Sequence, residues 1–206
     1  MKLGIIDYGA GNLHSVANVV KSIGYEGILI NRPELIEEKG VTHLILPGVG
    51  SFGDSMAALG RRGLIQPVKD WIAADKPFFG ICLGYQVLFE SSVESPGVDG
   101  LGVFKGHVVR FPEMGQKVPH MGWNQIKRLP GFEKVWEGQP DDPYLYFVHS
   151  FFPQPEDQSI IAGTCHYGTD FAAAISRGRL IACQCHPEKS QTAGQTLLKS
   201  FLARPA

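Results

Sequence analysis

The sequence has few charged residues and almost no charge imbalance. Asp, Glu, Lys and Arg make up only 19% of the 206 residues, and 19 basic against 20 acidic residues leave a formal net charge of −1. This balance gives no support to a nucleic-acid or membrane surface. The chain also lacks an apolar run of membrane-spanning length, a basic-then-apolar leader, an internal repeat and a low-complexity linker. With 44% hydrophobic residues, we expect a single cytoplasmic domain over residues 1–206.

Cysteine is scarce as well. The four cysteines are Cys82, Cys165, Cys183 and Cys185, and all lie in apolar, strand-like runs. They lack the paired spacing of a zinc site, and the run from Cys183 to Cys185 is better explained as one strand whose side chains alternate between faces. We therefore expect no disulfide, no metal and no cofactor.

Apolar strands alternate with amphipathic helices in the first half, which predicts parallel strands joined by helical crossovers. We expect strands near 3–7, 26–30 and 43–46, helices near 13–23 and 64–74, and a further apolar strand that leads to Cys82. From Gly102 onward, turns replace helices. Strands are expected near 106–111, 122–127, 144–150, 160–167, 171–176 and 179–185, followed by a helix near 192–202. These later strands suggest hairpins added to the same sheet.

One thiol stands at a predicted change from strand to helix. Cys82 follows the apolar run 77–81 and is flanked by Gly80 and Gly84, which suits a sharp elbow where glycines relieve backbone strain. The start of a helix also favours a thiolate. Far along the chain, another apolar strand leads to His186-Pro187-Glu188, in which the imidazole can act as base and the carboxylate can orient it. Each feature alone is more often structural, a buried cysteine or a surface turn; the pair favours nucleophilic catalysis.

The two segments together resemble the nucleophile elbow and the His-Glu end of the class I (triad) glutamine amidotransferases. Within that family, further segments are similar to the glutaminase subunits of imidazole glycerol phosphate synthase. These segments are 7–13, 46–53, 119–124 and 147–150, and the resemblance runs from residue 3 to about residue 200. It implies an α/β fold with a mostly parallel, flavodoxin-like sheet, flanking helices and antiparallel hairpin additions in the second half.

The resemblance also implies roles for individual residues. Cys82 would form a glutamyl thioester, His186 would carry protons and Glu188 would orient His186. The oxyanion would be stabilised by the backbone amides of Leu83 and of Val49, which lies in a glycine loop. The glutamine pocket would be lined by Gly50, Gln86, His149 and Ser150. Gln86 stands four residues after Cys82, on the same helical face. Phe151 replaces the tyrosine usual in the family, so only a backbone contact is expected there.

A glutaminase subunit implies a partner. In the resembled family, the partner of the heterodimer is a cyclase with a (β/α)₈ barrel, which uses the ammonia to make imidazole glycerol phosphate and an aminoimidazole carboxamide ribotide in histidine biosynthesis. Candidate interface residues are Asn12 in the loop 8–12, Met121, Trp123 and Asn124 in the turn 121–124, and Lys189. Trp123 could equally be a core residue, and Lys189 a solvated charge.

Three other interpretations stay open on the sequence alone. A cysteine peptidase would use the same thiol and histidine in an extended groove. A non-enzymatic module of flavodoxin-like architecture would need no reactive thiol. Amidotransferase subunits that serve pyridoxal phosphate or anthranilate synthesis are the nearest alternatives within the family. Glutamine-dependent ammonia release against peptide cleavage separates a glutaminase from the peptidase. Rapid reaction of Cys82 with iodoacetamide would count against the binding module. Histidine auxotrophy on deletion is the observation that would decide most.

Overall fold

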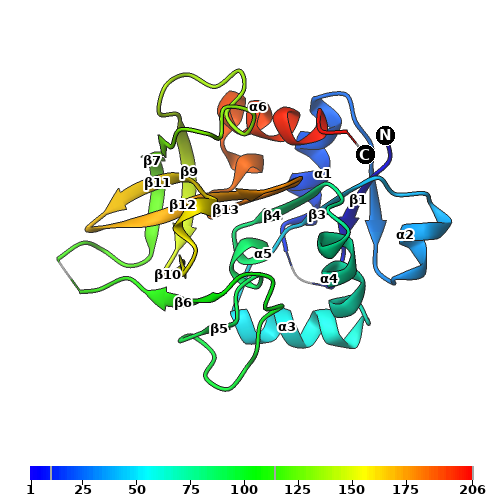
Figure 1. Ribbon diagram of the computed structural model, residues 1–206, viewed down its shortest axis with the longest axis horizontal. Coiled ribbons are helices and arrows are strands. Elements are labelled where there is room, and N and C mark those ends of the chain that lie inside the picture. Colours follow the sequence, from blue (N-terminus) through cyan, green and yellow to red (C-terminus); the bar gives the residue numbers. More distant parts are fainter. Residues whose placement is uncertain (10, 114, 206) are drawn as a thin grey trace.

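The computed structural model describes residues 1–9, 11–113 and 115–205. Its largest sheet has eight strands in the order β2-β1-β3-β4-β13-β12-β11-β8 (Figure 1). The first five in this order are parallel: β2 (Gly27–Ile30), β1 (Leu3–Ile6), β3 (His43–Leu46), β4 (Phe78–Ile81) and β13 (Leu180–Cys183). The antiparallel strands β12 (Thr169–Arg177), β11 (Ile161–Tyr167) and β8 (Lys127–Arg128) extend it. This arrangement confirms the predicted mixed α/β fold.

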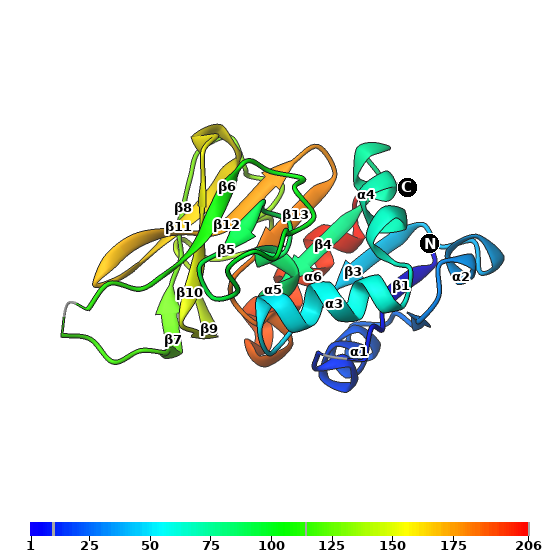
Figure 2. The ribbon, with the colours of Figure 1, turned by 90° about the horizontal axis from the view of Figure 1, so that it is seen from below.

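Helices cover both faces of the parallel part of the sheet (Figure 2). On one face, α1 (Leu13–Ser22) and α6 (Gln191–Leu202) pack against side chains such as Ile5, Ile45 and Phe79. On the other, α3 (Phe52–Arg61) and α4 (Ile65–Ala73) pack against their strand neighbours, such as Leu44 and Phe78. Because side chains alternate between faces along a strand, strands covered on both sides are mostly apolar, as β1 and β4 are throughout and β3 is after His43.

Two smaller sheets complete the second half of the chain. One has the order β10-β6-β5, from β10 (Phe151–Pro155), β6 (Gly106–Arg110) and β5 (Ser91–Ser92). The other pairs β7 (His120–Gln125) with β9 (Tyr144–His149) in antiparallel register, with Met121 opposite Val148 and Trp123 opposite Tyr146. The expectation that the later strands all join one sheet is therefore wrong for β6, β7 and β9, and β5 and β10 were not predicted. The predicted strand 122–127 is divided because Ile126 separates β7 from β8, which pair with different partners.

Two helices were absent from the sequence-based expectation. The short α2 spans Glu34–Glu38, and α3 follows the glycine loop directly. In α3, Gly53 and Gly60 lower the helix propensity of the segment, while Ser51 caps its N-terminus by accepting a hydrogen bond from the Asp54 amide. The helix predicted after Cys82 forms as α5, but it spans only Leu83–Gln86.

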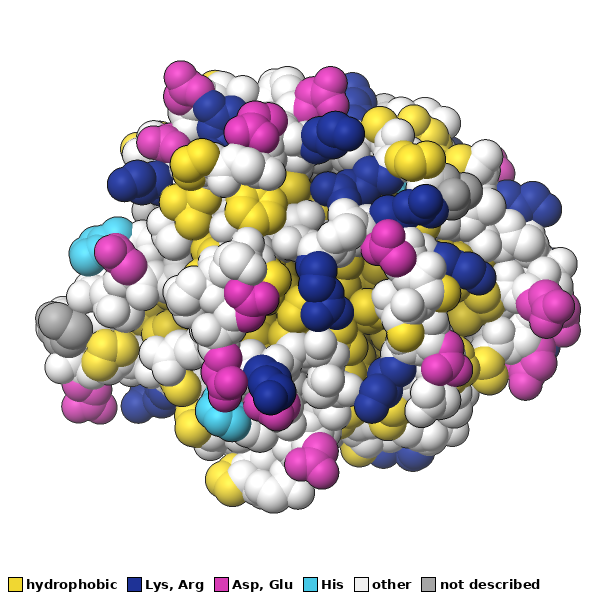
Figure 3. Space-filling view, viewed as in Figure 1, with side chains coloured by type: hydrophobic (Ala, Val, Ile, Leu, Met, Phe, Trp, Pro, Cys, Tyr) yellow, Lys and Arg dark blue, Asp and Glu magenta, His cyan; other side chains and the backbone are white. Residues whose placement is uncertain are grey.

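The surface agrees with the balanced composition. On the face seen in Figure 3, acidic and basic side chains are interspersed and form no large field of one sign. None of the helices in the described part of the chain is long and apolar enough to cross a membrane.

Candidate active site

Cys82 follows the last residue of β4 in a strained backbone conformation. Its φ is 53° and its ψ is −105°, in the region that L residues rarely adopt. The flanking glycines serve a different purpose from the one expected, because neither has a positive φ. A Cβ on Gly84 would collide with the Leu46 carbonyl oxygen, and one on Gly80 would lie 2.8 Å from the Gly84 carbonyl oxygen. The glycines therefore allow close packing, while Cys82 itself carries the strain of the elbow.

His186 and Glu188 form the buried partner of this thiol. The Nδ1 atom of His186 lies 2.7 Å from a Glu188 carboxylate oxygen, and the two side chains are 2% and 1% exposed. Nε2 is buried, and within the described residues it has no hydrogen-bond partner. Burial opposes protonation of the ring, but the neighbouring charges of Cys82 and Glu188 outweigh it and raise the pKa of His186 to about 10. The arrangement therefore favours the imidazolium form of His186 beside Cys82.

Backbone contacts to β9 hold this part of the site. The His186 amide donates to the Tyr146 carbonyl oxygen at 2.8 Å, and the Tyr146 amide donates to Ser190 Oγ at 2.9 Å. The Ser190 hydroxyl donates in turn to the His186 carbonyl oxygen at 2.6 Å. The imidazole is thus fixed to the small β7–β9 sheet as well as to the end of β13.

The two expected oxyanion donors do not face one point in this structure. The Leu83 amide donates to the Gly48 carbonyl oxygen at 3.4 Å. Since the carbonyl and amide of one trans peptide point in opposite directions, the Val49 amide is turned away from Leu83. Gly48 must be glycine here, because a Cβ would lie 2.8 Å from both Leu83 Cβ and Tyr8 Oη. The glycine loop is therefore closed against the elbow, and a rotation of the Gly48–Val49 peptide is needed before both amides can stabilise an oxyanion.

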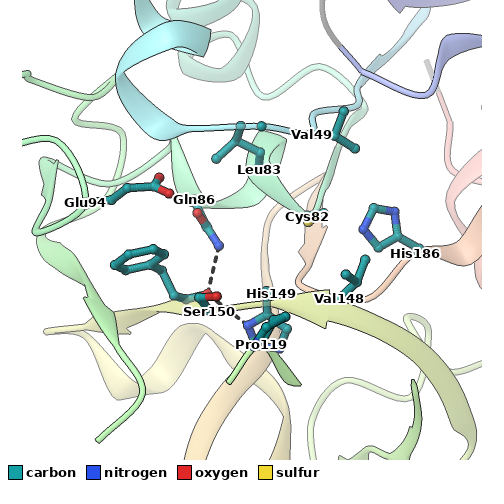
Figure 4. A pocket seen from close by; sticks show the side chains of 12 residues that line it. Val49, Cys82, Leu83, Gln86, Glu94, Pro119, Val148, His149, Ser150 and His186 are labelled. Atoms are coloured by element: carbon teal, nitrogen blue, oxygen red, sulfur yellow. Dashed lines mark hydrogen bonds between the residues drawn. The ribbon is translucent and has the colours of Figure 1, made fainter. Parts of the chain in front are cut away.

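A cavity of about 290 Å³ opens beside Cys82 (Figure 4). It is lined by eight of the nine residues predicted for the catalytic centre and the glutamine pocket: Val49, Gly50, Cys82, Leu83, Gln86, His149, Ser150 and His186. The ninth, Glu188, lies behind the imidazole. The structure thus brings together residues from four separate segments of the chain.

One wall of the cavity is formed by the neutral His149, which is backed by a second neutral histidine, His120. His149 Nδ1 lies 2.9 Å from the Phe151 carbonyl oxygen, which can only accept, so this nitrogen carries the proton. His149 Nε2 then accepts from His120 Nδ1 at 3.1 Å, and His120 Nε2 accepts from the Asn124 amide at 3.2 Å. Burial lowers the pKa of His149 to about 3 and that of His120 to about 4. The backbone of Phe151 therefore organises this wall, and the missing tyrosine hydroxyl is not needed for it.

Four further residues line the cavity: Glu94, Pro119 and Val148, which had no assigned place, and Phe151, for which only a backbone contact was expected. Among the described residues that line the cavity, Glu94 supplies the one carboxylate. Its Oε2 accepts from the Phe52 amide at 2.8 Å, at the start of α3. The sequence around it, Ser92-Val93-Glu94-Ser95, gives no signal for such a role because only the fold brings it opposite the thiol.

The predicted interface residues have different environments. Met121 and Trp123 are 62% and 47% exposed, so the alternative that Trp123 is a core residue is wrong. Trp123 contacts the Tyr146 ring edge-on, and Lys189 Nζ lies 5.8 Å from the centre of that ring. Asn12 and Asn124 are half-buried. In the loop 8–12, residue 10 lies outside the described residues, and Tyr8 is buried, with its hydroxyl donating to the Pro47 carbonyl oxygen.

All four cysteines are free and buried. The described residues include one group that could hold a metal ion, formed by Glu90, His107 and Glu156. These side chains are exposed and do not line the cavity.

Comparison with known proteins agrees with the geometry. Residues 4–204 match the family model "Glutamine amidotransferase class-I". The chain is 44% identical over 209 residues to the imidazole glycerol phosphate synthase subunit HisH of Geobacter sulfurreducens, covering 97% of each chain. It is 48% identical over 200 residues to the HisH subunit of Desulfitobacterium hafniense strain DCB-2, covering 97% of this chain and 92% of that one.

Solved structures show the same fold at lower identity. A crystal structure of a glutamine amidotransferase matches with a TM-score of 0.76 at 20% identity, over 98% of this chain and 97% of that one. The structure of PurLQS from Thermotoga maritima matches with a TM-score of 0.75 at 17% identity and the same coverage. The fold and the cavity define an amidotransferase-type α/β protein. The chain belongs to the class I glutamine amidotransferase family.

Proposed function

We propose that this chain is the glutaminase subunit of an imidazole glycerol phosphate synthase, and that it hydrolyses L-glutamine to glutamate and ammonia for histidine biosynthesis. The observation that carries the proposal is the placement of Cys82 and His186 on one cavity, with Glu188 behind the imidazole. Full-length similarity to HisH subunits supports the choice within the family. The cavity volume of about 290 Å³ suits one amino acid better than an extended peptide.

The chemistry follows from the charges in the site. The Cys82 thiolate attacks the side-chain carboxamide carbon, and the carbonyl oxygen becomes an oxyanion. The His186 imidazolium gives its proton to the leaving nitrogen, so that ammonia departs and a glutamyl thioester remains. His186, now neutral, takes a proton from water, which attacks the thioester and releases glutamate. Glu188 stabilises each imidazolium form. Leu83 and a rotated Val49 amide would stabilise the oxyanion in both steps.

Polar groups at the far side of the cavity match the amino-acid end of glutamine. Glu94 offers a carboxylate to the α-ammonium group. Gln86 turns its amide nitrogen toward the Phe151 carbonyl oxygen at 2.9 Å, so its oxygen is left as a second acceptor. Gly50, His149 and Ser150 complete the predicted pocket. We assign Glu94 to substrate binding together with the residues predicted from the sequence.

Ammonia release requires an acceptor in the same complex, and the names of the relatives describe them as subunits. We propose a heterodimer with a (β/α)₈ cyclase. The docking surface would be the exposed apolar side chains of the β7–β9 sheet, Met121, Trp123 and Tyr144, with Asn12, Asn124 and Lys189 as polar neighbours. Exposed Met and aromatic residues are typical interface anchors. Val49, 39% exposed at the cavity, would let such a partner act on the glycine loop.

Replacement of the thiol tests the proposed activity. In the complex with a cyclase, Cys82→Ala should abolish glutamate release from glutamine, because no other group on the cavity can form the thioester. Cys165→Ala removes another buried sulfur that does not line the cavity and should retain turnover. Turnover by Cys82→Ala at the wild-type rate would refute the assignment, and peptide cleavage without glutaminase activity would favour a peptidase.

A further inference from the structure

A buried amide lies against the proposed nucleophile. Gln184 Nε2 is 3.6 Å from Cys82 Sγ, and Gln184 is 0% exposed. The register of the sheet explains the contact. In the parallel pair β4–β13, Ile81 lies beside Cys183, so the next residues on each chain, Cys82 and Gln184, are also neighbours. Gln184 does not line the cavity and so is not a substrate contact.

The orientation of this amide follows from a chain of hydrogen bonds. The Phe151 carbonyl oxygen can only accept, so the Gln86 side chain must turn its Nε2 toward it, at 2.9 Å. The same nitrogen donates its second proton to Gln184 Oε1 at 3.1 Å. With its oxygen engaged by Gln86, Gln184 can present only its NH₂ group to the sulfur. Rotation of the Gln86 amide would set its oxygen against two acceptor oxygens, and rotation of the Gln184 amide would set two NH₂ groups against each other and turn an oxygen toward the sulfur.

We propose that Gln184 stabilises the Cys82 thiolate by hydrogen bonding, and that Gln86 and the Phe151 carbonyl hold Gln184 in the donating orientation. The proposal rests on the nucleophilic role of Cys82 given above. A hydrogen bond from a buried amide favours the charged form of the sulfur over the neutral thiol. It also keeps the sulfur in place on the strained elbow during attack. Gln86 would then have two roles. Its nitrogen would hold Gln184 in the donating orientation, and its oxygen would face the substrate.

Alkylation of Cys82 without glutamine tests the proposal. The rate of carbamidomethylation by iodoacetamide is measured across pH, with Cys82 identified by peptide mass spectrometry, because only the thiolate reacts. Gln184→Met keeps an unbranched side chain of similar length and removes the donor. We expect its pH profile to move up by about one pH unit, so that the rate below the midpoint falls about tenfold, while the plateau at high pH stays near the wild-type value.

Two further variants make the result decisive. Gln86→Leu frees the Gln184 amide to rotate and should shift the profile in the same direction by a smaller amount. Ser176→Ala removes another buried hydrogen bond, from its hydroxyl to the Leu180 carbonyl oxygen, and should leave the profile unchanged. An unchanged midpoint in both glutamine variants, or a lower plateau without a shift, would overturn the proposal. Neither result would affect the proposed glutaminase function, which depends on the Cys82→Ala variant.

Discussion

The closed glycine loop predicts that Val49→Pro removes activation but not basal hydrolysis. Proline lacks a backbone N–H, so this substitution deletes one oxyanion donor and changes no side chain of the site other than that of residue 49. The preceding residue, Gly48, is the residue type that best tolerates the restriction proline imposes on its neighbour. In the present structure the Val49 amide is turned away from Leu83, whose own amide is engaged by the Gly48 carbonyl oxygen. The basal state therefore loses nothing when the Val49 proton is removed.

The size of the effect follows from two opposing contributions. Rotating the Gly48–Val49 peptide breaks one long hydrogen bond of 3.4 Å, which costs about 0.5–1.5 kcal/mol net. An oxyanion donor contributes about 2.7–4 kcal/mol to the transition state, or roughly 10²–10³ in kcat. The rotation is therefore inexpensive enough for a bound partner to drive. Its benefit is realised in the rate and not in glutamine affinity.

The assay is steady-state glutaminase kinetics of the chain alone and of the chain with a cyclase that carries its nucleotide ligand. Wild type should be weakly active alone and faster by about 10²–10³ in the loaded complex. Val49→Pro should match the wild type alone and gain little from the partner, with KM changed by a small factor. Val49→Ala, which keeps the amide, is the matched control and should be activated normally. Full activation of Val49→Pro would refute the assignment of this donor, and full activity of the isolated wild type would refute the closed loop as a restraint.

Three further outcomes are expected. His186→Ala should lower glutaminase kcat more than Glu188→Gln, because the imidazole carries the protons and the carboxylate only orients it; the reverse order in steady-state assays would show that the roles are wrongly assigned. Glu94→Gln should raise KM for glutamine by about 10-fold to 100-fold with kcat little changed, as expected for loss of a charge-assisted contact to the ammonium group, and an unchanged KM would remove Glu94 from the pocket. Trp123→Ala should weaken cyclase binding in calorimetry by about 2 kcal/mol. The control Leu29→Ala truncates another exposed apolar residue, which is 45% exposed on the remote strand β2, and it should leave cyclase binding unchanged.

Local sequence patterns predicted the parallel core and the reactive residues. The runs that form β1 and β4 are apolar at every position, β3 is apolar after His43, and the stripe of α1 recurs at helical spacing, so all are visible without tertiary information. Cys82 and His186 each follow such a strand, and parallel strands bring their carboxyl ends to one edge. Family resemblance was needed for His149, which would otherwise be assigned to the core.

The other features of the site could not be predicted because they depend on contacts between residues far apart in the sequence. Nothing near Glu94 marks it as a pocket residue, because its position comes from the Phe52 amide at the start of α3. The role of Gln184 depends on the pairing of β13 with β4 and on an amide orientation set by a carbonyl 33 residues earlier in the sequence, that of Phe151. The fold is also needed to explain why positions 80 and 84 are glycines. A Cβ at either position would collide with backbone atoms of Leu46 or of the elbow itself.

The charges around Cys82 indicate which part of the site a partner has to control. The helix after Cys82 has only four residues, so its dipole contributes little, whereas the raised pKa of His186 keeps a positive charge beside the thiol. His186 and Glu188 are buried and already hydrogen-bonded, and Cys82 lies on the same cavity as His186, whereas the oxyanion amides are not aligned. A nucleophile that is prepared in advance beside an unformed oxyanion site can bind glutamine but gains little transition-state stabilisation. A partner therefore has to act on the glycine loop and not on the thiol. If the partner leaves access to Cys82 unchanged, iodoacetamide should alkylate this residue at similar rates with and without the partner.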